Sequence, residues 1–109
     1  MNIQTNYQNF KSSPWTEQFI EKRVSRLSRF LGDSASVQVQ IKFENQKYFS
    51  SLAIHNSRHD HAFTAEAENF YECFSLVLDK ASRALVEEKR KLKDRINKKY
   101  FSIDNESRP

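Results

Sequence analysis

The chain has 109 residues, of which 38% are hydrophobic and 29% charged, and its formal net charge is +4. This length allows one folded domain with one modest core, and the composition excludes a disordered or fibrous chain. A single glycine excludes the glycine-rich loops that hold nucleotide phosphates. No apolar run approaches the roughly 18 residues of a membrane helix, and residues 1–10 lack a secretory signal pattern, so we expect a cytoplasmic protein.

The first elements predicted are a short strand and a helix. Ile3 alternates with polar neighbours in residues 1–6, which is typical of a strand. Ser13 can cap a helix that starts at Pro14, and Gly32 can end it. The apolar residues of this helix follow a spacing that places them in one stripe: Ile20, Val24, Leu27 and Leu31.

Three strands are predicted in the middle of the chain. From Val37 to Glu44 apolar and polar residues alternate, as in a strand with one buried face. A turn at Asn45 and Gln46 leads to a second strand at 48–55, and the polar run 56–60 leads to a third at 61–66. Because the links are short, we expect antiparallel pairing.

A long second helix is predicted after the strands. Asn69, with Glu72 three residues later, forms a capping-box-like start. A helix from 69 to 98 would be about 45 Å long, longer than the small sheet, so we expect the part after Val86 to project. We expect a domain at 1–98 and a short disordered tail at 99–109. The apolar stripe of the helix contains Phe70, Phe74, Leu78, Ala81, Leu85, Leu92 and Ile96.

The element order is therefore β-α-β-β-β-α, an α+β fold. We expect an antiparallel four-stranded sheet with two helices packed on one face and the other face open to solvent.

Positive charge is concentrated on the two helices. Residues 80–99 hold nine basic and three acidic residues, a charge of +6, so the remainder of the chain sums to −2. This asymmetry indicates a surface for a polyanion, and RNA fits better than a specific DNA site because no helix-turn-helix spacing is present. The candidate RNA-binding residues are Lys22, Arg23, Arg26, Arg29, Lys80, Arg83, Lys89, Arg90 and Lys91.

Other candidate sites are weaker. Aromatic side chains could stack on bases, although Trp15 is more simply explained by packing at the core edge. The histidines and the lone cysteine lack the spacing of a zinc site, so we expect no bound metal. No carboxylate pair or activated nucleophile can be recognised, so we expect the protein to hold no cofactor and to have no enzymatic activity. Cys73 suits a small buried hydrophobe. The residues concerned are Trp15, Tyr48, Tyr100 and Phe101 for stacking, and His55, His59, His61 and Cys73 for metal.

The junction before the second helix carries a recognisable pattern. It reads Ala65, Glu66, Ala67, Glu68, Asn69, Phe70, Tyr71, followed by Asp79, Lys80 and Arg83. This order, over residues 1–98, resembles the ribosome hibernation promoting factor and ribosome-associated inhibitor A family, in which Asp-Met-Tyr precedes a helix with Asp-Lys and a later Arg. Asn69 departs from the usual Asp but can cap equally well, and Glu87 stands where Lys is common.

The resemblance implies a fold like that of double-stranded-RNA-binding domains. It also implies a binding site in the messenger and transfer RNA channel of the small ribosomal subunit. There the chain would block translation sterically. The resemblance implies a short-form member that lacks the family's extra C-terminal domain. We expect this protein to be monomeric when free and to bind neither a membrane nor a small-molecule substrate. The basic positions that would face ribosomal RNA are Lys22, Arg26, Arg29, Lys80, Arg83, Lys89 and Lys91.

A protein-interaction adaptor that uses the long C-terminal helix, independently of RNA, is the alternative. Its apolar positions approximate a coiled-coil heptad, but Glu88 occupies a seam position. Nuclease treatment discriminates between the two, because an adaptor would keep its partner after RNA is digested.

Overall fold

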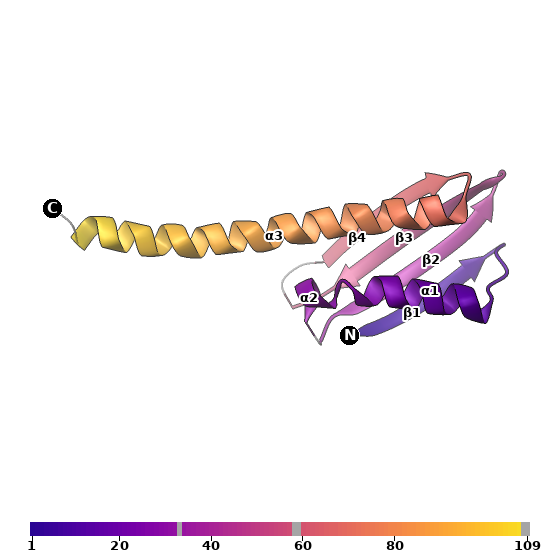
Figure 1. The fold of residues 1–109 in the computed structure, drawn as a ribbon, viewed down its shortest axis with the longest axis horizontal. Helices are drawn as coiled ribbons and strands as arrows, with labels where there is room; N and C mark the ends of the chain where they lie inside the picture. The colour runs from indigo at the N-terminus through magenta and orange to yellow at the C-terminus, as the bar shows by residue number, and fades with distance from the viewer. Residues whose placement is uncertain (33, 58–59, 108–109) are drawn as a thin grey trace.

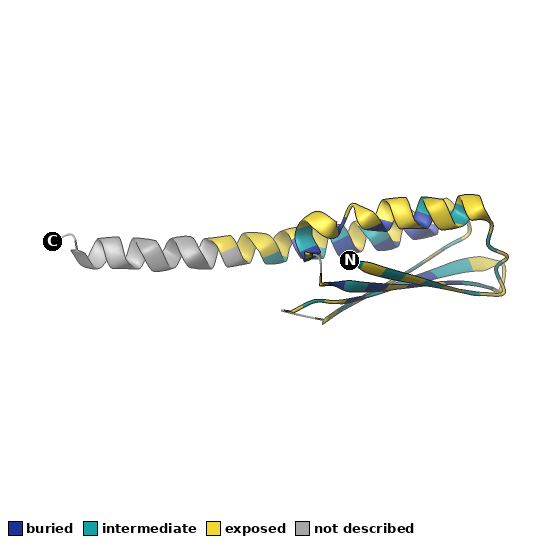
Figure 2. Ribbon diagram, turned by 90° about the horizontal axis from the view of Figure 1, so that it is seen from below, coloured by how far each residue is buried: buried dark blue, intermediate teal, exposed yellow. Residues whose placement is uncertain are grey.

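The computed structural model describes the backbone of residues 1–32, 34–57 and 60–107, and within the last helix the side chains up to Lys91 and at Lys93. A four-stranded sheet has both long helices on one face, side by side (Figures 1 and 2). The predicted α+β class is confirmed. The elements are β1 (Asn2–Gln8), α1 (Pro14–Ser25), α2 (Ser28–Leu31), β2 (Ser36–Glu44), β3 (Lys47–His55), β4 (Asp60–Ala67) and α3 (Phe70–Ser107).

The sheet is mixed, so the expectation of a fully antiparallel sheet is wrong. Its order is β1-β2-β3-β4, and β1 pairs with β2 in parallel, with Ile3 opposite Val37. The helical crossover between β1 and β2 returns the chain to the end of the sheet where β1 began, which requires a parallel pair. Only the two later pairs are antiparallel. The likeness to double-stranded-RNA-binding domains stays a prediction.

The turn between β2 and β3 forms where the sequence predicts it. Asn45 and Gln46 have φ angles of 53° and 63°. A two-residue hairpin with two positive φ angles twists in the sense of the flanking strands, and Asn tolerates this conformation well. The turn thereby sets the register of β2 against β3, with Glu44 opposite Lys47.

The first helical segment is divided, whereas the sequence predicted one helix. It starts as expected, because Ser13 accepts a hydrogen bond from the Thr16 backbone N–H at 3.2 Å. The Ser25 hydroxyl donates to the carbonyl of Glu21 at 2.6 Å, a bond that bends helices, and the backbone N–H of Leu27 bonds three residues back to Val24. α1 therefore ends at Ser25, and Gly32, with a φ of 81°, ends α2.

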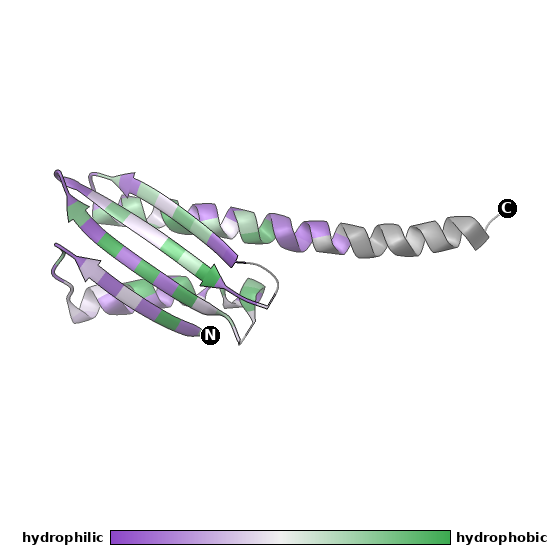
Figure 3. Cartoon of the chain, turned by 180° about the vertical axis from the view of Figure 1, so that it is seen from behind, coloured by the Kyte–Doolittle hydropathy of each residue, from purple (hydrophilic) through white to green (hydrophobic). Residues whose placement is uncertain are grey.

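The core lies between the helices and the sheet. The inward residues of β2 and β3 are buried, as the predicted alternation requires. Figure 3 shows hydrophobic and hydrophilic residues alternating along the strands. Among the described residues, Ser50 is a polar residue buried in this otherwise apolar core. Its hydroxyl donates a hydrogen bond to the Cys73 carbonyl at 3.1 Å. The largest buried side chains are Phe74, Ile20, Ile41, Leu52, Ile54, Val24, Val37, Val39 and Val77.

α3 extends well past the sheet, as predicted (Figure 1). Asn69 caps it by accepting the backbone N–H of Tyr71 at 2.8 Å, and Leu85 is the last buried residue of the described stripe. The helix continues to Ser107, beyond the end expected near Lys98, because no glycine or proline interrupts residues 70–108. The division into domain 1–98 and tail 99–109 stays a prediction. In the part of the chain that the structure describes, no helix is long and apolar enough to cross a membrane.

Cys73 is buried on α3. Its thiol donates to the Ser50 hydroxyl at 3.2 Å and lies 3.3 Å from the carbonyl oxygen of Tyr48. Burial raises the pKa of the thiol, and the hydrogen bond with Ser50 only partly opposes that effect. The predicted role as a small buried residue is confirmed, and the raised pKa disfavours the thiolate form that a nucleophile requires.

This raised pKa predicts a loss of stability at alkaline pH. Below about pH 8, the folded and unfolded chains both hold the thiol proton, and this group contributes no pH dependence. As pH rises through the ordinary thiol pKa, the unfolded chain loses the proton first, so the free energy of unfolding falls. Urea unfolding at neutral and alkaline pH should show a smaller fall for Cys73→Ala than for the parent chain. Equal falls would show that the thiol is not protected.

Candidate nucleic-acid interface

The helical layer carries a groove between its first two helices and α3. Arg23, Arg26 and Arg29 line one wall, and Leu78 and Asp79 of α3 lie on the other. All three arginines are exposed. They lie close together because they follow one another at three-residue spacing, which keeps them on one side of the helical segment.

Phe30 links this wall to the far part of α3. The Arg29 guanidinium lies 5.4 Å from the centroid of the Phe30 ring, and the Lys89 ammonium lies 5.9 Å from the same centroid. A ring face attracts a cation, so Phe30 holds two positive side chains near each other that would otherwise repel. Lys89 lines a neighbouring pocket together with Arg29 and Phe30. We call the three arginines of the groove and this adjoining Lys89 the groove cations.

Three further predicted residues lie on the outer side of the layer. Lys22 is exposed on α1, and Arg83 and Arg90 are exposed on α3, seven residues apart and therefore on one side of that helix. Arg83 pairs with Asp79, with Nε 3.1 Å from Oδ2, while its side chain stays 81% exposed. Such an exposed pair is weak, so Arg83 can exchange this partner for a phosphate.

The remaining two predicted residues lie on the other flank of α3. The Lys80 Nζ donates to the backbone carbonyl of Thr64 at 2.7 Å, on the edge strand β4. Lys91 is eleven residues further along, about three turns, and therefore on the same side. The structure thus gathers the groove cations but separates Lys80 and Lys91 from them, and Lys80 has a local role in covering a strand edge.

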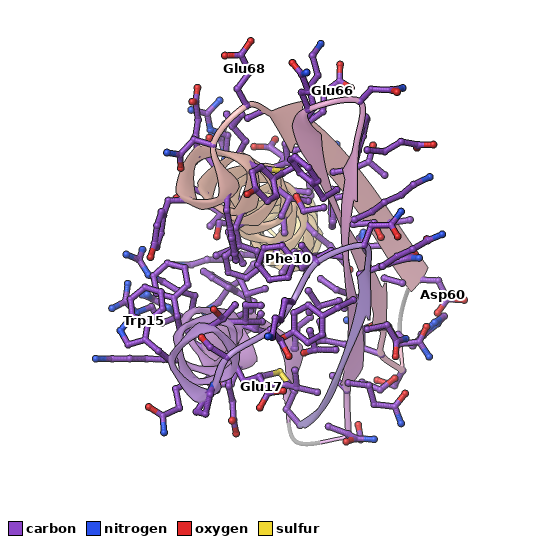
Figure 4. All side chains as sticks on the ribbon, turned by 90° about the vertical axis from the view of Figure 1, so that its right-hand side faces the viewer. Phe10, Trp15, Glu17, Asp60, Glu66 and Glu68 are labelled. Atoms are coloured by element: carbon purple, nitrogen blue, oxygen red, sulfur yellow. The ribbon has the colours of Figure 1, made fainter. Side chains whose placement is uncertain are left out.

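Aromatic residues form a second feature at the start of α1 and α3. Trp15 stacks on Phe19, with ring centroids 5.3 Å apart and planes 9° apart, and Tyr71 meets both rings edge to face. Trp15 is 55% exposed and Tyr71 48%. Phe70 packs against Phe19 and Tyr71, and Phe10 packs against Phe70. Figure 4 shows Phe10 between Trp15 and the sheet. We call Trp15, Phe19 and Tyr71 the aromatic platform.

The other aromatic candidates are not placed to bind bases. Tyr48 points toward the helices and packs on Phe43, Phe10 and Phe70, so the expectation that it is exposed is wrong. The side chains of Tyr100 and Phe101 lie outside the described residues.

The candidate metal ligands lie apart or have other partners. His55 is 3.0 Å from Asp60, and His61 is 2.8 Å from Glu88, whereas Cys73 lies in the core. His59 lies outside the described residues. Within the described ranges, no three His, Cys, Asp or Glu side chains are placed to hold a metal ion.

The heptad-like positions of α3 are turned inward. Ala81 and Leu85 are buried and Leu78 packs against the core, while Glu88 bonds to His61 of β4. Leu92 and Ile96 lie outside the residues whose side chains are described. The described heptad positions therefore pack in the domain's own core and are not available to form a coiled coil with a partner helix.

Sequence reasoning missed the residues that connect the candidate site. Phe30 was not singled out, because an apolar residue beside arginines in a helix carries no signal of its own. Phe19 and Tyr71 meet only once α1 and α3 are placed side by side. A helical projection of residues 14–31 would have put Phe19, Arg23, Arg26 and Phe30 on one side, which is the available signal.

Comparison with known proteins gives concordant results. Residues 3–93 match the family model described as Sigma 54 modulation protein / S30EA ribosomal protein. A "Ribosome hibernation promoting factor" of Azotobacter vinelandii is 33% identical over 73 residues, 67% of this chain and 68% of that protein.

Two solved structures share the fold. The N-terminal domain of Thermus thermophilus Protein Y has a TM-score of 0.71 at 16% identity, covering 78% of this chain and 96% of that one. A ribosomal subunit interface protein from Coxiella burnetii also has a TM-score of 0.71, at 18% identity, covering 83% and 99%. The resemblance predicted from the sequence is confirmed: this chain belongs to the Sigma 54 modulation protein / S30EA ribosomal protein family.

Proposed function

We propose that this chain is a ribosome hibernation factor that binds the small ribosomal subunit in the messenger and transfer RNA channel and blocks translation sterically. The names of its relatives support an action on ribosomes. The groove cations are the single observation that carries an RNA contact, because three arginines line the groove and Lys89 of α3 meets one of them, Arg29, at the Phe30 ring. Lys and Arg contacts to phosphate supply affinity with little sequence preference.

The proposed mechanism requires binding alone. The groove cations and the outer residues Lys22, Arg83 and Arg90 lie on the helical layer, so one side of the molecule can face ribosomal phosphates. The sheet lies behind that layer (Figure 2), and its bulk would exclude messenger and transfer RNA. Lys80 and Lys91, on the other flank, would add contacts only if RNA also lines that side.

The adaptor alternative is less well supported. The described heptad positions of α3 are occupied by the core, so a partner helix would have to use the outer side, where Arg83 and Arg90 lie. A row of cations is an unfavourable seam for a coiled coil. Digestion of RNA in a lysate separates the alternatives, since an adaptor would stay with its partner and a ribosome factor would be released.

The test is co-sedimentation of the purified chain with small ribosomal subunits over a range of salt concentrations, together with translation in a purified system. If the four groove cations each neutralise one phosphate, log affinity should fall with log salt with a slope of about −3. Translation should fall as the subunits become saturated. A slope near zero would contradict the phosphate contacts, and full-speed translation by saturated subunits would contradict the steric block.

A further inference from the structure

The aromatic platform presents Trp15 to solvent. Phe19 stacks on Trp15 at a centroid distance of 5.3 Å and so covers one face of the indole, while Tyr71 stands at 71° to it. Trp15 nevertheless remains 55% exposed. Figure 4 shows Trp15 on the helical side of the molecule, away from the sheet. An exposed indole held in place by its neighbours is a ready surface for another flat ring.

The platform is continuous with the positive groove. The Arg23 guanidinium lies 5.1 Å from the centroid of Phe19, the ring beneath Trp15, and Arg23 also lines the groove with Arg26 and Arg29. Trp15, Phe19 and Arg23 follow one another at four-residue spacing, so Arg23 lies about two helical turns from Trp15 on the same side of α1. An RNA strand with a base on Trp15 therefore reaches this positive charge with phosphates further along the strand. This charge favours a ligand that carries both an aromatic ring and phosphates over the apolar side chain of a protein partner.

We propose that Trp15 stacks on an unpaired base of single-stranded RNA, and that phosphates further along the same strand lie on Arg23 and Arg26. The proposal rests on the proposed function and names the part of the RNA that the platform would take. Tyr71 is a positioning residue, because its ring holds the sides of Trp15 and Phe19. Stacking tolerates any base, so the site would select for an unpaired nucleotide and not for a sequence.

The first test uses the intrinsic fluorescence of the chain, since Trp15 is its sole tryptophan. The full chain is titrated with a single-stranded polyuridylate oligomer and with an abasic oligomer of the same length and charge. Binding is measured separately by fluorescence anisotropy of a dye on each oligomer. We expect both oligomers to bind at low salt, with the polyuridylate quenching the tryptophan and the abasic oligomer leaving it unchanged.

Two results would overturn the stacking site. Equal quenching by both oligomers would show that charge alone alters the indole environment, and binding of both without quenching would place the RNA elsewhere. Failure of both to bind would contradict the stacking site together with the RNA surface of the proposed function.

The second test uses variants on ribosomes. Trp15→Ala should bind small subunits roughly tenfold more weakly, and Trp15→Phe should recover most of that loss because it restores a ring. Leu76→Ala is the matched control, since Leu76 is another exposed apolar residue, 41% exposed, on α3. It should bind as the parent chain does. Circular dichroism at the working temperature confirms that each variant is folded.

The outcomes separate the two proposals. If Trp15→Ala binds ribosomes as tightly as the parent chain, the stacking site is wrong while the ribosome function stands. If the parent chain itself fails to bind ribosomes, the proposed function is wrong, and the oligomer titration then decides whether the platform binds single-stranded RNA on its own.

Discussion

Replacing both Arg26 and Arg29 with glutamate is expected to release the chain from small ribosomal subunits. Each charge-assisted hydrogen bond to a phosphate contributes about 1.5–3 kcal/mol, and about 1.4 kcal/mol corresponds to a tenfold change in affinity. Loss of two such contacts should weaken binding at least about 100-fold, and repulsion by the new carboxylates adds to this. Sedimentation with subunits measures the effect directly.

The matched control reverses two cations on the other side of the molecule. Lys42 of β2 and Lys47 of β3 lie on the sheet face that is turned away from the helices. Replacing both with glutamate changes the net charge by the same amount as the groove variant. We expect this control to sediment with subunits nearly as the parent chain does. Equal loss in the two variants would show that total charge matters and that the groove does not.

The reversal of Arg26 and Arg29 should leave the fold intact. Both side chains are exposed, and the bond from Arg29 Nε to the Arg26 carbonyl, at 3.4 Å, is long. Surface substitutions of this kind usually change the free energy of unfolding by no more than about 0.5 kcal/mol. The unfolding curve of the groove variant should therefore nearly coincide with that of the parent chain. The control should unfold somewhat more easily, because it loses the 2.7 Å ion pair of Lys42 with Glu44 and puts a carboxylate opposite Glu44.

Local pattern predicted most of the fold. Alternation in 37–43 identified β2 and its buried face, Asn45 and Gln46 identified the hairpin turn, and Asn69 identified the start of α3. Each of these signals lies within a few neighbouring residues. The parallel pairing of β1 is different, because the seven residues of this strand do not indicate the direction of the strand beside it. That direction follows only from the crossover through α1.

The sequence predicted which basic residues belong to the candidate site, but not how their side chains are arranged in space. Lys80 and Arg83 are three residues apart and seemed equivalent in the sequence, yet Lys80 bonds to Thr64 of β4 while Arg83 faces solvent. Which flank of α3 meets α1 depends on how the helix is rotated on the sheet, and that rotation is a property of tertiary packing. The contact of Lys89 with Phe30 has the same origin.

Truncation of Phe74 to alanine is expected to be the most destabilising single change considered for this chain. Phe74 is 1% exposed and packs against Phe19 and Phe70, at the point where α1 and α3 meet. Loss of a buried phenylalanine ring costs about 3–5 kcal/mol, a large share of the roughly 5–15 kcal/mol that stabilises a small domain. Chemical denaturation with urea should show a correspondingly lower midpoint.

Val86 provides the control on the same helix, because it is 47% exposed and lies on the outer side of α3. Val86→Ala should shift the free energy of unfolding by no more than about 0.5 kcal/mol, since little apolar contact is lost and alanine favours a helix. A loss comparable to that of Phe74→Ala would show that α3 is rotated differently on the sheet. Such a rotation would also carry Lys89 away from Phe30, so the stability of this variant tests the geometry of the groove without any ribosome present.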